Sequence, residues 1–597
     1  MTISGLKIYL FVYRHAIIPF FLETKMSDFD KLNRYQKRTF VPENANLSNK
    51  DQVVSLYEKL LARGINSAGE LEGWLTDLSE LESALDQEYS ILNIRMTCQT
   101  DDPVRADSYK KFVETVLPAV KPVADKVNRK YLAERQRFEL DKKRFEVYDR
   151  DARVDAEMFR KENVPLQTQL DLLSQEYQTV CGAMMVNFQG RERTLQQMSK
   201  FLYEPDRPLR ESAWQATVER RLREKDRLEE IFDKMVSLRD QVAANTGCKN
   251  YVEYKFRAGH RFDYTPADCK TYHAAVARLV VPVYQEILKK RRRTMELETL
   301  RPWDTSVDPK GRPALKPFEK VDELIAGVNK IFDRIDPELG LQFKMIDQLG
   351  LLDLDSRKGK APGGYQSTLA EARKPFIFMN AVGLGGDVET LLHEGGHAFH
   401  SLAAADEPLY PYRHAPLEFC EVASMGMELL GQEHLEIFYK PEELQRTRFE
   451  HLEGVIQLLP WVACVDSFQH WIYENPRHDR DQRTQKWLEI HNRFMGGVID
   501  WTSLTEQQKY LWHRQLHIFE CPFYYIEYGI AQLGALQLWV RAKRNPRTAL
   551  ADYRKALTLG GSRPLPELFT AAGLTFDFSE KTIAPLMDAV LEELAKL

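Results

Sequence analysis

The segment at residues 391–401 reads LLHEGGHAFHS and constrains the fold more than any other part of the chain. Its two histidines, His393 and His397, are four residues apart, so on a helix they project from the same face. Two imidazoles at this spacing can hold one divalent metal ion, and Glu394 can then reach a water molecule on that ion. The pattern therefore predicts a helix that carries a metal site with an acid beside it.

Two glycines stand in the middle of this expected helix. Each costs about 1 kcal/mol of helix stability relative to alanine. A helix bears that cost where a metal, a substrate or another backbone must come close, so Gly395 and Gly396 favour a functional site over a plain core helix. Upstream, Gly385, Gly386 and Asp387 are typical of a helix start with acid in its first turn.

The composition limits the classes of protein to which the chain can belong. Its 597 residues exceed the length at which one hydrophobic core stops growing, so we expect two or more lobes. A net charge of -5 is too small over this length to indicate nucleic acid or an anionic membrane as a partner. The seven cysteines form no C-x-x-C pair, which indicates a reducing compartment and no disulfide framework.

The first 25 residues differ in character from the rest. Residues 8–21 are mostly apolar, but Arg14 and His15 interrupt them, and no basic start or cleavage site suits a signal peptide. We expect residues 1–25 to be an extension ahead of a start at Met26, with a short surface-bound or partner-bound segment as the alternative. No apolar run reaches membrane-spanning length, so we expect no stable membrane association.

Apolar residues recur at helical spacing along most of the chain. Residues 26–200 are interpreted as a helical region, with a helical hairpin at 123–160 whose mixed charges argue against nucleic-acid binding. Long single helices are expected over 208–244 and 266–297. A short apolar run at 375–380 (PFIFMN) predicts a strand, either a sheet edge that can pair with an extended peptide or a buried structural hairpin.

A catalytic zinc ion needs a third protein ligand and an open position for water. His400 lies two helical turns after His393, too far to share a metal with it while the helix stays regular, so we expect a packing or supporting role. Residues 417–430 (LEFCEVASMGMELL) predict a second helix with Glu421 and Glu428 on one face. Because carboxylates in so apolar a helix need partners, we expect Glu421 to be the third ligand and Glu428 to orient a histidine.

These two segments together resemble the zinc oligopeptidases of the thimet oligopeptidase and oligoendopeptidase F family. In that family, H-E-x-x-H is followed after about one helix by a liganding glutamate, which Glu421 matches. Other family-like segments are at residues 245–256, 300–304, 361–365, 375–380, 522–536 and 559–564. The resemblance covers roughly residues 200–590 and is closer to oligoendopeptidase F.

The resemblance implies a mainly α-helical fold, with two helical lobes around a deep substrate channel and a small β-sheet beside the zinc-binding helix of a zincin-like core. It implies a catalytic metallopeptidase domain at 201–597 behind the helical region at 26–200. It also implies one Zn2+ per chain, bound by His393, His397 and Glu421. The enzyme would be cytoplasmic and would cleave short unfolded oligopeptides.

The family also places a histidine and two tyrosines beside the reacting carbonyl group. His517, Tyr525 and Tyr528 fit that arrangement, and Tyr524 is the alternative to Tyr525. A phenol is a neutral donor that can face a developing negative charge, while Glu394 would be the general base for the attacking water. A dipeptidyl carboxypeptidase on the same fold, and a non-catalytic peptide-binding protein with a vestigial metal site, are the alternative functions.

Overall fold

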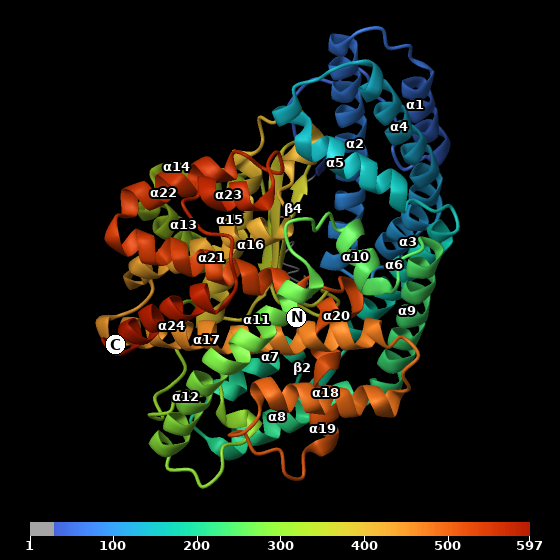
Figure 1. Ribbon diagram of the computed structural model, residues 1–597. Helices are drawn as coiled ribbons and strands as arrows, with labels where there is room; N and C mark the ends of the chain where they lie inside the picture. Colours follow the sequence, from blue (N-terminus) through green and yellow to red (C-terminus); the bar gives the residue numbers. More distant parts are fainter. Residues whose placement is uncertain (1–28) are drawn as a thin grey trace, which may run out of the picture.

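The structure is a computed structural model that describes residues 29–597 (Figure 1). The predicted extension at 1–25 and the start at Met26 lie outside the described residues. Helices predominate, and the strands of the described part form two small sheets, which confirms the expected mainly α-helical fold. In the same part of the chain, no helix has both the length and the apolar character needed to span a membrane.

The first helices after residue 29 build a core of their own. They are α1 (Lys50–Ala62), α2 (Ala68–Cys98), α3 (Pro103–Lys111), α4 (Leu117–Arg137), α5 (Lys142–Met158) and α6 (Asn163–Gly182). Helices α4 and α5 are the hairpin expected over 123–160. Trp74 of α2 and Tyr131 of α4 are buried in an apolar cluster that α1, α2, α4 and α5 share.

In the middle of the chain, two segments that were each predicted to be one helix are each divided into two helices. The elements are α7 (Leu195–Ser199), α8 (Arg207–Leu222), α9 (Lys225–Asn245), α10 (Tyr251–Ala258), α11 (Pro266–Leu279) and α12 (Val281–Thr294). The single helices predicted over 208–244 and 266–297 are therefore wrong. Pro282 explains the second break, because it lacks the N–H that a continuous helix requires, whereas the residues at the first break include no helix breaker.

A two-stranded hairpin was not predicted from the sequence. Strands β1 (Met185–Phe188) and β2 (Arg191–Thr194) pair antiparallel around a two-residue turn. Both turn residues, Gln189 and Gly190, have positive φ angles, as a tight hairpin turn of this length requires. Of these two residues only Gly190 is typical of such a turn, so the sequence pattern does not predict the hairpin.

The second sheet lies directly before the metal-motif helix. Its strands are β3 (Leu352–Asp355), β4 (Tyr365–Leu369) and β5 (Lys374–Ala381), in the order β3-β5-β4, with β3 parallel and β4 antiparallel to β5. Of the two alternatives for residues 375–380, the sheet edge is wrong, because β5 is the central strand, and the buried hairpin is confirmed, because β5 pairs antiparallel with the preceding strand β4. A near-continuous apolar run suits a strand that is covered on both faces, and residues 375–379 are buried. The edge is β4.

The remaining helices enclose the metal motif. They are α13 (Val321–Ile335), α14 (Pro337–Gln348), α15 (Gly385–Ala403), α16 (Leu417–Gly431), α17 (Pro441–Glu474), α18 (Arg480–Met495), α19 (Thr505–Lys509), α20 (Leu516–Glu520), α21 (Tyr525–Arg544), α22 (Pro546–Leu557), α23 (Leu565–Ala571) and α24 (Glu580–Leu594). Helix α16 packs against α15 on one side and α21 on another (Figure 1). Helix α15 also packs on strands β4 and β5. The two helices predicted to share a metal are therefore neighbours.

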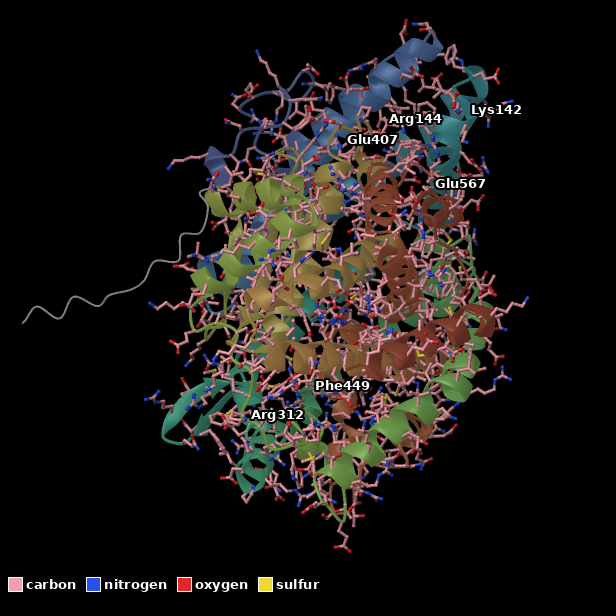
Figure 2. The ribbon with its side chains drawn as sticks, turned by 90° about the vertical axis from the view of Figure 1, so that its left-hand side faces the viewer. Lys142, Arg144, Arg312, Glu407, Phe449 and Glu567 are labelled. Atoms are coloured by element: carbon pink, nitrogen blue, oxygen red, sulfur yellow. The ribbon has the colours of Figure 1, made fainter. Side chains whose placement is uncertain are left out.

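The N-terminal helices hold the loop that joins α15 to α16. Arg144 of α5 forms an ion pair with Glu407 of this loop (Figure 2). The guanidinium of Arg144 also lies 4.8 Å from the ring centroid of Tyr412, and the Tyr412 hydroxyl donates a 2.8 Å hydrogen bond to the Arg144 carbonyl oxygen. The loop between the two metal-motif helices is therefore in direct contact with helix α5.

Candidate active site

Asp387 fixes the start of helix α15. Its carboxylate accepts hydrogen bonds from the backbone N–H groups of Val382, Gly383 and Leu384 at 2.7 to 2.8 Å. These donors belong to the connection from β5 to the helix, so one buried acid sets the direction in which α15 leaves the sheet.

The two glycines of α15 lie where other elements come close. A Cβ atom on Gly396 would be 2.6 Å from the backbone oxygen of Ala423 and from the Cα atom of Ser424, both on α16. A Cβ atom on Gly395 would be 2.4 Å from the ring of Phe332 on α13. The expectation that these glycines allow a close approach is therefore confirmed, and for Gly396 the approaching group is the backbone of α16.

Three side chains converge at this contact between α15 and α16. Nε2 of His393 and Nε2 of His397 lie 3.3 and 3.5 Å from the same carboxylate oxygen of Glu421. All three donor atoms lie within 4.8 Å of one another. Two imidazole nitrogens and one carboxylate oxygen at such distances are a donor set that fits a catalytic zinc ion. His393 and His397 retain partial exposure, so water can reach the position that these donors leave open.

The carboxylates shape the charge at this cluster. Burial would lower the pKa of His393, but hydrogen bonds to Glu421 and Glu428 outweigh it and hold that pKa well above its ordinary value. Burial likewise opposes ionisation of Glu421, but the charges of His397 and His393 hold its pKa well below its usual range. Glu421 is therefore held as a carboxylate, the charge state in which it can bind a cation.

Glu428 and His451 form a second layer behind His393. Nδ1 of His393 lies 2.6 Å from one Glu428 oxygen, and Nε2 of His451 on α17 lies 3.4 Å from the other. A carboxylate in this position accepts a hydrogen bond from Nδ1–H, so it fixes the ring orientation and leaves Nε2 as the nitrogen that can bind a metal ion. Sequence reasoning anticipated Glu428 but missed His451, which lies on another helix and in no motif.

Glu394 is buried beside the cluster with an unused oxygen. Its Oε2 atom has no hydrogen-bond partner among the described residues. Burial raises the pKa of Glu394, while the charges of His393 and His397 lower it. Gly364, in the loop before β4, lies over this side chain, since a Cβ atom there would be 3.4 Å from Glu394 Oε1. An acid in this setting is suited to accepting and returning a proton.

The tyrosines at the start of α21 face different partners. The hydroxyl of Tyr524 donates a 2.6 Å hydrogen bond to Glu421 Oε1. The hydroxyl of Tyr525 instead donates to Gln515 Oε1 at 3.1 Å and receives the Trp461 indole N–H at 3.2 Å. Of the two alternatives left by the sequence, Tyr524 is therefore the one directed at the donor cluster.

Tyr528 and His517 lie together beside the cluster. Nε2 of His517 lies 3.2 Å from the Tyr528 hydroxyl. Burial, followed by the charge of Glu421, raises the pKa of Tyr528 well above its ordinary value, with a further contribution from Glu394. Tyr528 therefore remains a protonated donor. Burial lowers the pKa of His517 to about 4, so its ring is neutral near pH 7.

His400 does not join the donor cluster. It is buried, its ring packs edge-on against Phe419 at 5.9 Å between centroids, and burial lowers its pKa to about 3. A neutral imidazole packed against an aromatic ring is the packing role that the sequence analysis gave as one of two options.

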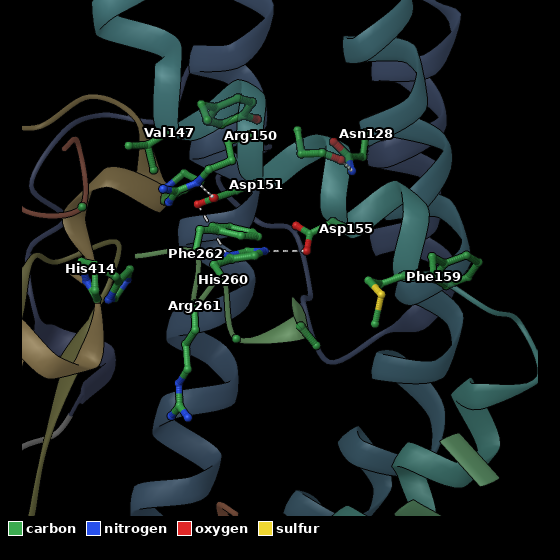
Figure 3. Close-up of a pocket in the computed structure, with 18 of the residues that line it drawn as sticks. Asn128, Val147, Arg150, Asp151, Asp155, Phe159, His260, Arg261, Phe262 and His414 are labelled. Carbon is green, nitrogen blue, oxygen red and sulfur yellow. Dashed lines mark hydrogen bonds and ion pairs between the residues drawn. The ribbon is translucent and has the colours of Figure 1, made fainter. Parts of the chain in front are cut away.

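A cavity of about 720 Å³ lies between the N-terminal helices and the elements around α16 (Figure 3). Asp151 and Asp155 of α5 face His260, which is 3.5 and 2.8 Å from their carboxylates. Glu418, one helical turn before Glu421, also lines the cavity, whereas the three side chains of the donor cluster do not. The cavity therefore reaches the first turn of α16, and the donor cluster is not part of its lining.

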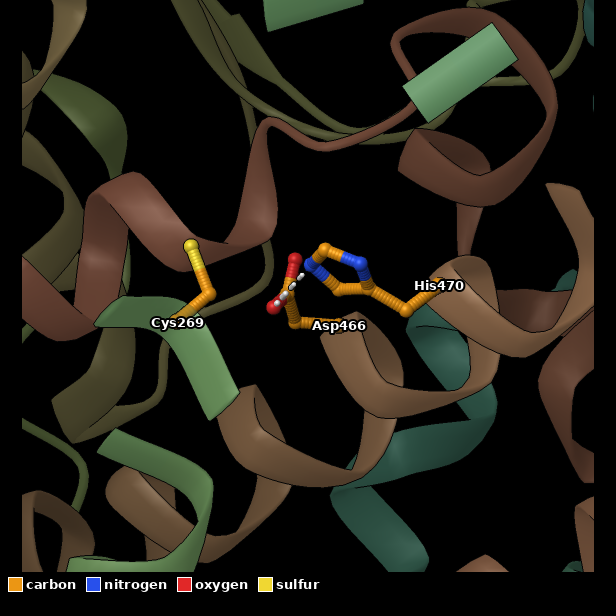
Figure 4. Close-up of side chains that lie close together, drawn as sticks. All are labelled: Cys269, Asp466 and His470. Carbon is orange, nitrogen blue, oxygen red and sulfur yellow. Dashed lines mark ion pairs between the residues drawn. The ribbon is translucent and has the colours of Figure 1, made fainter. Parts of the chain in front are cut away.

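A second group of metal-type donors lies away from this cluster (Figure 4). Cys269 of α11 lies close to Asp466 and His470 of α17, and Nε2 of His273 donates a 2.7 Å hydrogen bond to Asp466. All four side chains are buried. Because a catalytic site must admit water and substrate, the partly exposed cluster on α15 and α16 is the better candidate for an active centre.

Comparisons with known proteins match most of the chain. Residues 200–587 match the model of Peptidase family M3, and residues 43–159 match that of the Peptidase M3 N-terminal domain. A solved structure described as a putative oligoendopeptidase F superposes with a TM-score of 0.88 at 28% identity, covering 94% of this chain and 99% of the other. The structure of PZ peptidase A with an inhibitor gives a TM-score of 0.87 at 28% identity, covering 95% and 99%.

The curated relatives are more distant and are matched over shorter stretches. The oligoendopeptidase F homolog of Borreliella burgdorferi is 23% identical over 331 residues, which is 53% of this chain and 54% of that protein. The chain therefore spans about half the length of the relative that it matches.

Proposed function

Because this chain belongs to peptidase family M3, we propose that it is a zinc-dependent endopeptidase that hydrolyses short unfolded oligopeptides. The observation that carries the proposal is the convergence of His393, His397 and Glu421, with the buried acid Glu394 beside them. An intact acid at this position supports catalysis over binding alone, because a site that only binds peptides needs no general base.

In this proposal His393, His397 and Glu421 hold one zinc ion. When bound, the ion supplies a Lewis acid that lowers the pKa of water and polarises the carbonyl group of the substrate. Glu428 keeps the His393 ring oriented through the 2.6 Å contact at Nδ1. Tyr524 does the same for Glu421, because its hydroxyl donates to the carboxylate oxygen that does not face the histidines.

Glu394 moves the proton. Its unpaired Oε2 accepts a proton from the attacking water, and the same oxygen then returns that proton to the amine that leaves. Burial favours this exchange, because it raises the pKa of Glu394 toward the range where the carboxyl group can both accept and donate.

Tyr528 stabilises the negative charge that develops on the carbonyl oxygen. It is a neutral, protonated phenol close to Glu421 and Glu394, and a donor in this place is more favourable to the transition state than to the ground state. Nε2 of His517 lies 3.2 Å from the Tyr528 hydroxyl and helps to hold it in place. Tyr525 forms hydrogen bonds with Gln515 and Trp461, so in this proposal it does not contact the substrate.

Strand β4 is the proposed support for the substrate backbone. It is an edge strand of its sheet, and α15 packs on the same sheet. An extended peptide can add to such an edge through main-chain hydrogen bonds. The loop at Gly363 and Gly364, which precedes β4 and reaches Glu394, would bring the scissile bond to the acid.

Digestion of a mixed peptide pool, read by mass spectrometry beside elemental analysis of the same protein, tests this function. We expect one zinc per chain and cleavage at internal bonds of short peptides, with equal turnover of free and amidated C termini. A dipeptidyl carboxypeptidase would be established instead if peptides with a free C terminus released only dipeptides and amidated peptides were not cleaved. A zinc-loaded protein that binds peptides without cleaving them would refute catalysis.

A further inference from the structure

The Gln515 side chain connects a buried aromatic pair to His517. Its Oε1 atom accepts hydrogen bonds from the Trp461 indole at 3.2 Å and from the Tyr525 hydroxyl at 3.1 Å. Its Nε2 atom lies 2.8 Å from Nδ1 of His517, whose other nitrogen lies 3.2 Å from the Tyr528 hydroxyl. One continuous chain of polar contacts therefore runs from Trp461 to Tyr528.

The indole of Trp461 decides which end of the Gln515 amide faces His517. An indole N–H is a donor and never an acceptor. If the amide were rotated by half a turn, its NH2 group would oppose that indole donor at about the same distance, and the indole would lose this acceptor. The oxygen of Gln515 must therefore face Trp461, so its N–H must face His517.

Nδ1 of His517 is consequently an acceptor. A neutral imidazole has one donor nitrogen and one acceptor nitrogen, and burial keeps this ring neutral near pH 7. The ring proton therefore sits on Nε2, where it donates to the Tyr528 oxygen. Since the Tyr528 oxygen already accepts this bond, its single O–H proton is free to point elsewhere.

We propose that Gln515 is a positioning residue that keeps the His517 proton on Nε2 and so keeps the Tyr528 O–H directed at the carbonyl oxygen of the substrate. The inference rests on the proposed function, because it concerns how the tyrosine donor is oriented. In the opposite tautomer, Nε2 of His517 would accept the Tyr528 proton, and the developing negative charge would face an oxygen lone pair. Gln515 acts only through His517.

The substitution Gln515→Glu tests this chain of contacts. The side chain keeps its shape but loses the donor, so Nδ1 of His517 must carry a proton to face it. We expect kcat to fall about 100-fold, the loss typical of one oxyanion donor, with little change in KM. Nitrogen NMR of zinc-loaded, histidine-labelled protein should show His517 protonated at Nε2 alone in the wild type and at Nδ1 in the variant.

Three further variants separate positioning from a structural effect. Gln515→Met removes the donor without adding charge, so it should also lower kcat while the protein stays folded. Tyr525→Phe leaves the Trp461 donor in place, so the wild-type His517 tautomer should persist. In a Tyr528→Phe background, Gln515→Glu should lower kcat no further, because its effect passes through the Tyr528 hydroxyl. A His517→Asn spectrum identifies the His517 signals.

Two results would overturn the proposal. One is a wild-type His517 that carries its proton on Nδ1. The other is an equal loss of kcat from Gln515→Glu with and without the Tyr528 hydroxyl. If the wild-type protein cleaves no peptide at all, the proposed function fails, but the NMR experiment still decides whether Gln515 sets the tautomer.

Discussion

The carboxylate of Glu428 lies 2.6 Å from Nδ1 of His393, the ring nitrogen that does not face Glu421. One carboxylate thus lies at each end of the imidazole ring. Because Glu428 holds the ring at Nδ1, the Nε2 atom of His393 is directed at the donor cluster.

Removing this support should weaken metal binding. We expect Glu428→Ala to reduce zinc affinity by about 10- to 100-fold, because His393 loses the acceptor that sets its orientation and tautomer. Competition against a chelator of known affinity measures the change. Glu433→Ala is a matched control, since Glu433 is an exposed acid in the short 3-10 helix that directly follows α16. Equal affinities for the two variants would argue against an orienting role.

The close approach of α15 and α16 predicts a second effect. Gly396→Ala would place a Cβ atom 2.6 Å from the α16 backbone, so we expect a loss of about 1–3 kcal/mol of folding free energy, typical of overpacking. Zinc affinity should fall as well, because the helices that bring His397 and Glu421 together must separate.

Gly386→Ala supplies the control on the same helix. A Cβ atom there meets nothing within 4 Å, so this substitution should be neutral or slightly stabilising. Chemical denaturation of both variants gives the comparison. If Gly396→Ala proved as stable as Gly386→Ala and bound zinc as tightly, the close packing of the two helices would not matter for the site.

His260 predicts a pH-dependent contact between α5 and the loop after α10. Burial would lower its pKa, but the hydrogen bond with Asp155 and the charge of Asp151 outweigh burial and the opposing charge of Arg150, so the pKa is raised. A raised pKa means that the folded state binds the proton more tightly. The stability gained is therefore fully present below the unfolded value of 6.5 and is lost as the pH rises through the folded value.

Thermal unfolding of the wild type and of His260→Gln checks this sign. The wild type should be the more stable of the two at about pH 5.5, and the difference should shrink by about pH 8.5. Asp155→Asn should reduce the same pH dependence. A difference that grew with pH would contradict the assigned charge state of His260.

The metal motif was predictable because its geometry is local. His393, Glu394 and His397 share one helix, so spacing alone places them. Glu421 lies on another helix, but two acids on one face of an apolar stretch indicate that something must compensate their burial. The sequence also predicted the start of α15 near Gly385 and a helix over residues 417–430, and the structure has these helices at Gly385–Ala403 and Leu417–Gly431.

Features that depend on tertiary pairing were not predictable in the same way. The apolar run of β5 suits either an edge or a centre, and only its partners on both sides make it central. Tyr524 and Tyr525 are adjacent at the start of a helix, where about 100° of rotation separates their directions. Gln515 belongs to no motif, and its importance comes entirely from what surrounds it.

The most direct test of the account is the peptide turnover of Glu394→Gln, measured on protein whose zinc content is determined in the same sample. The account predicts that the variant keeps one zinc per chain, because Glu394 is not among the donors, and that turnover falls by about 100- to 10,000-fold. Wild-type turnover by the zinc-loaded variant would contradict the account.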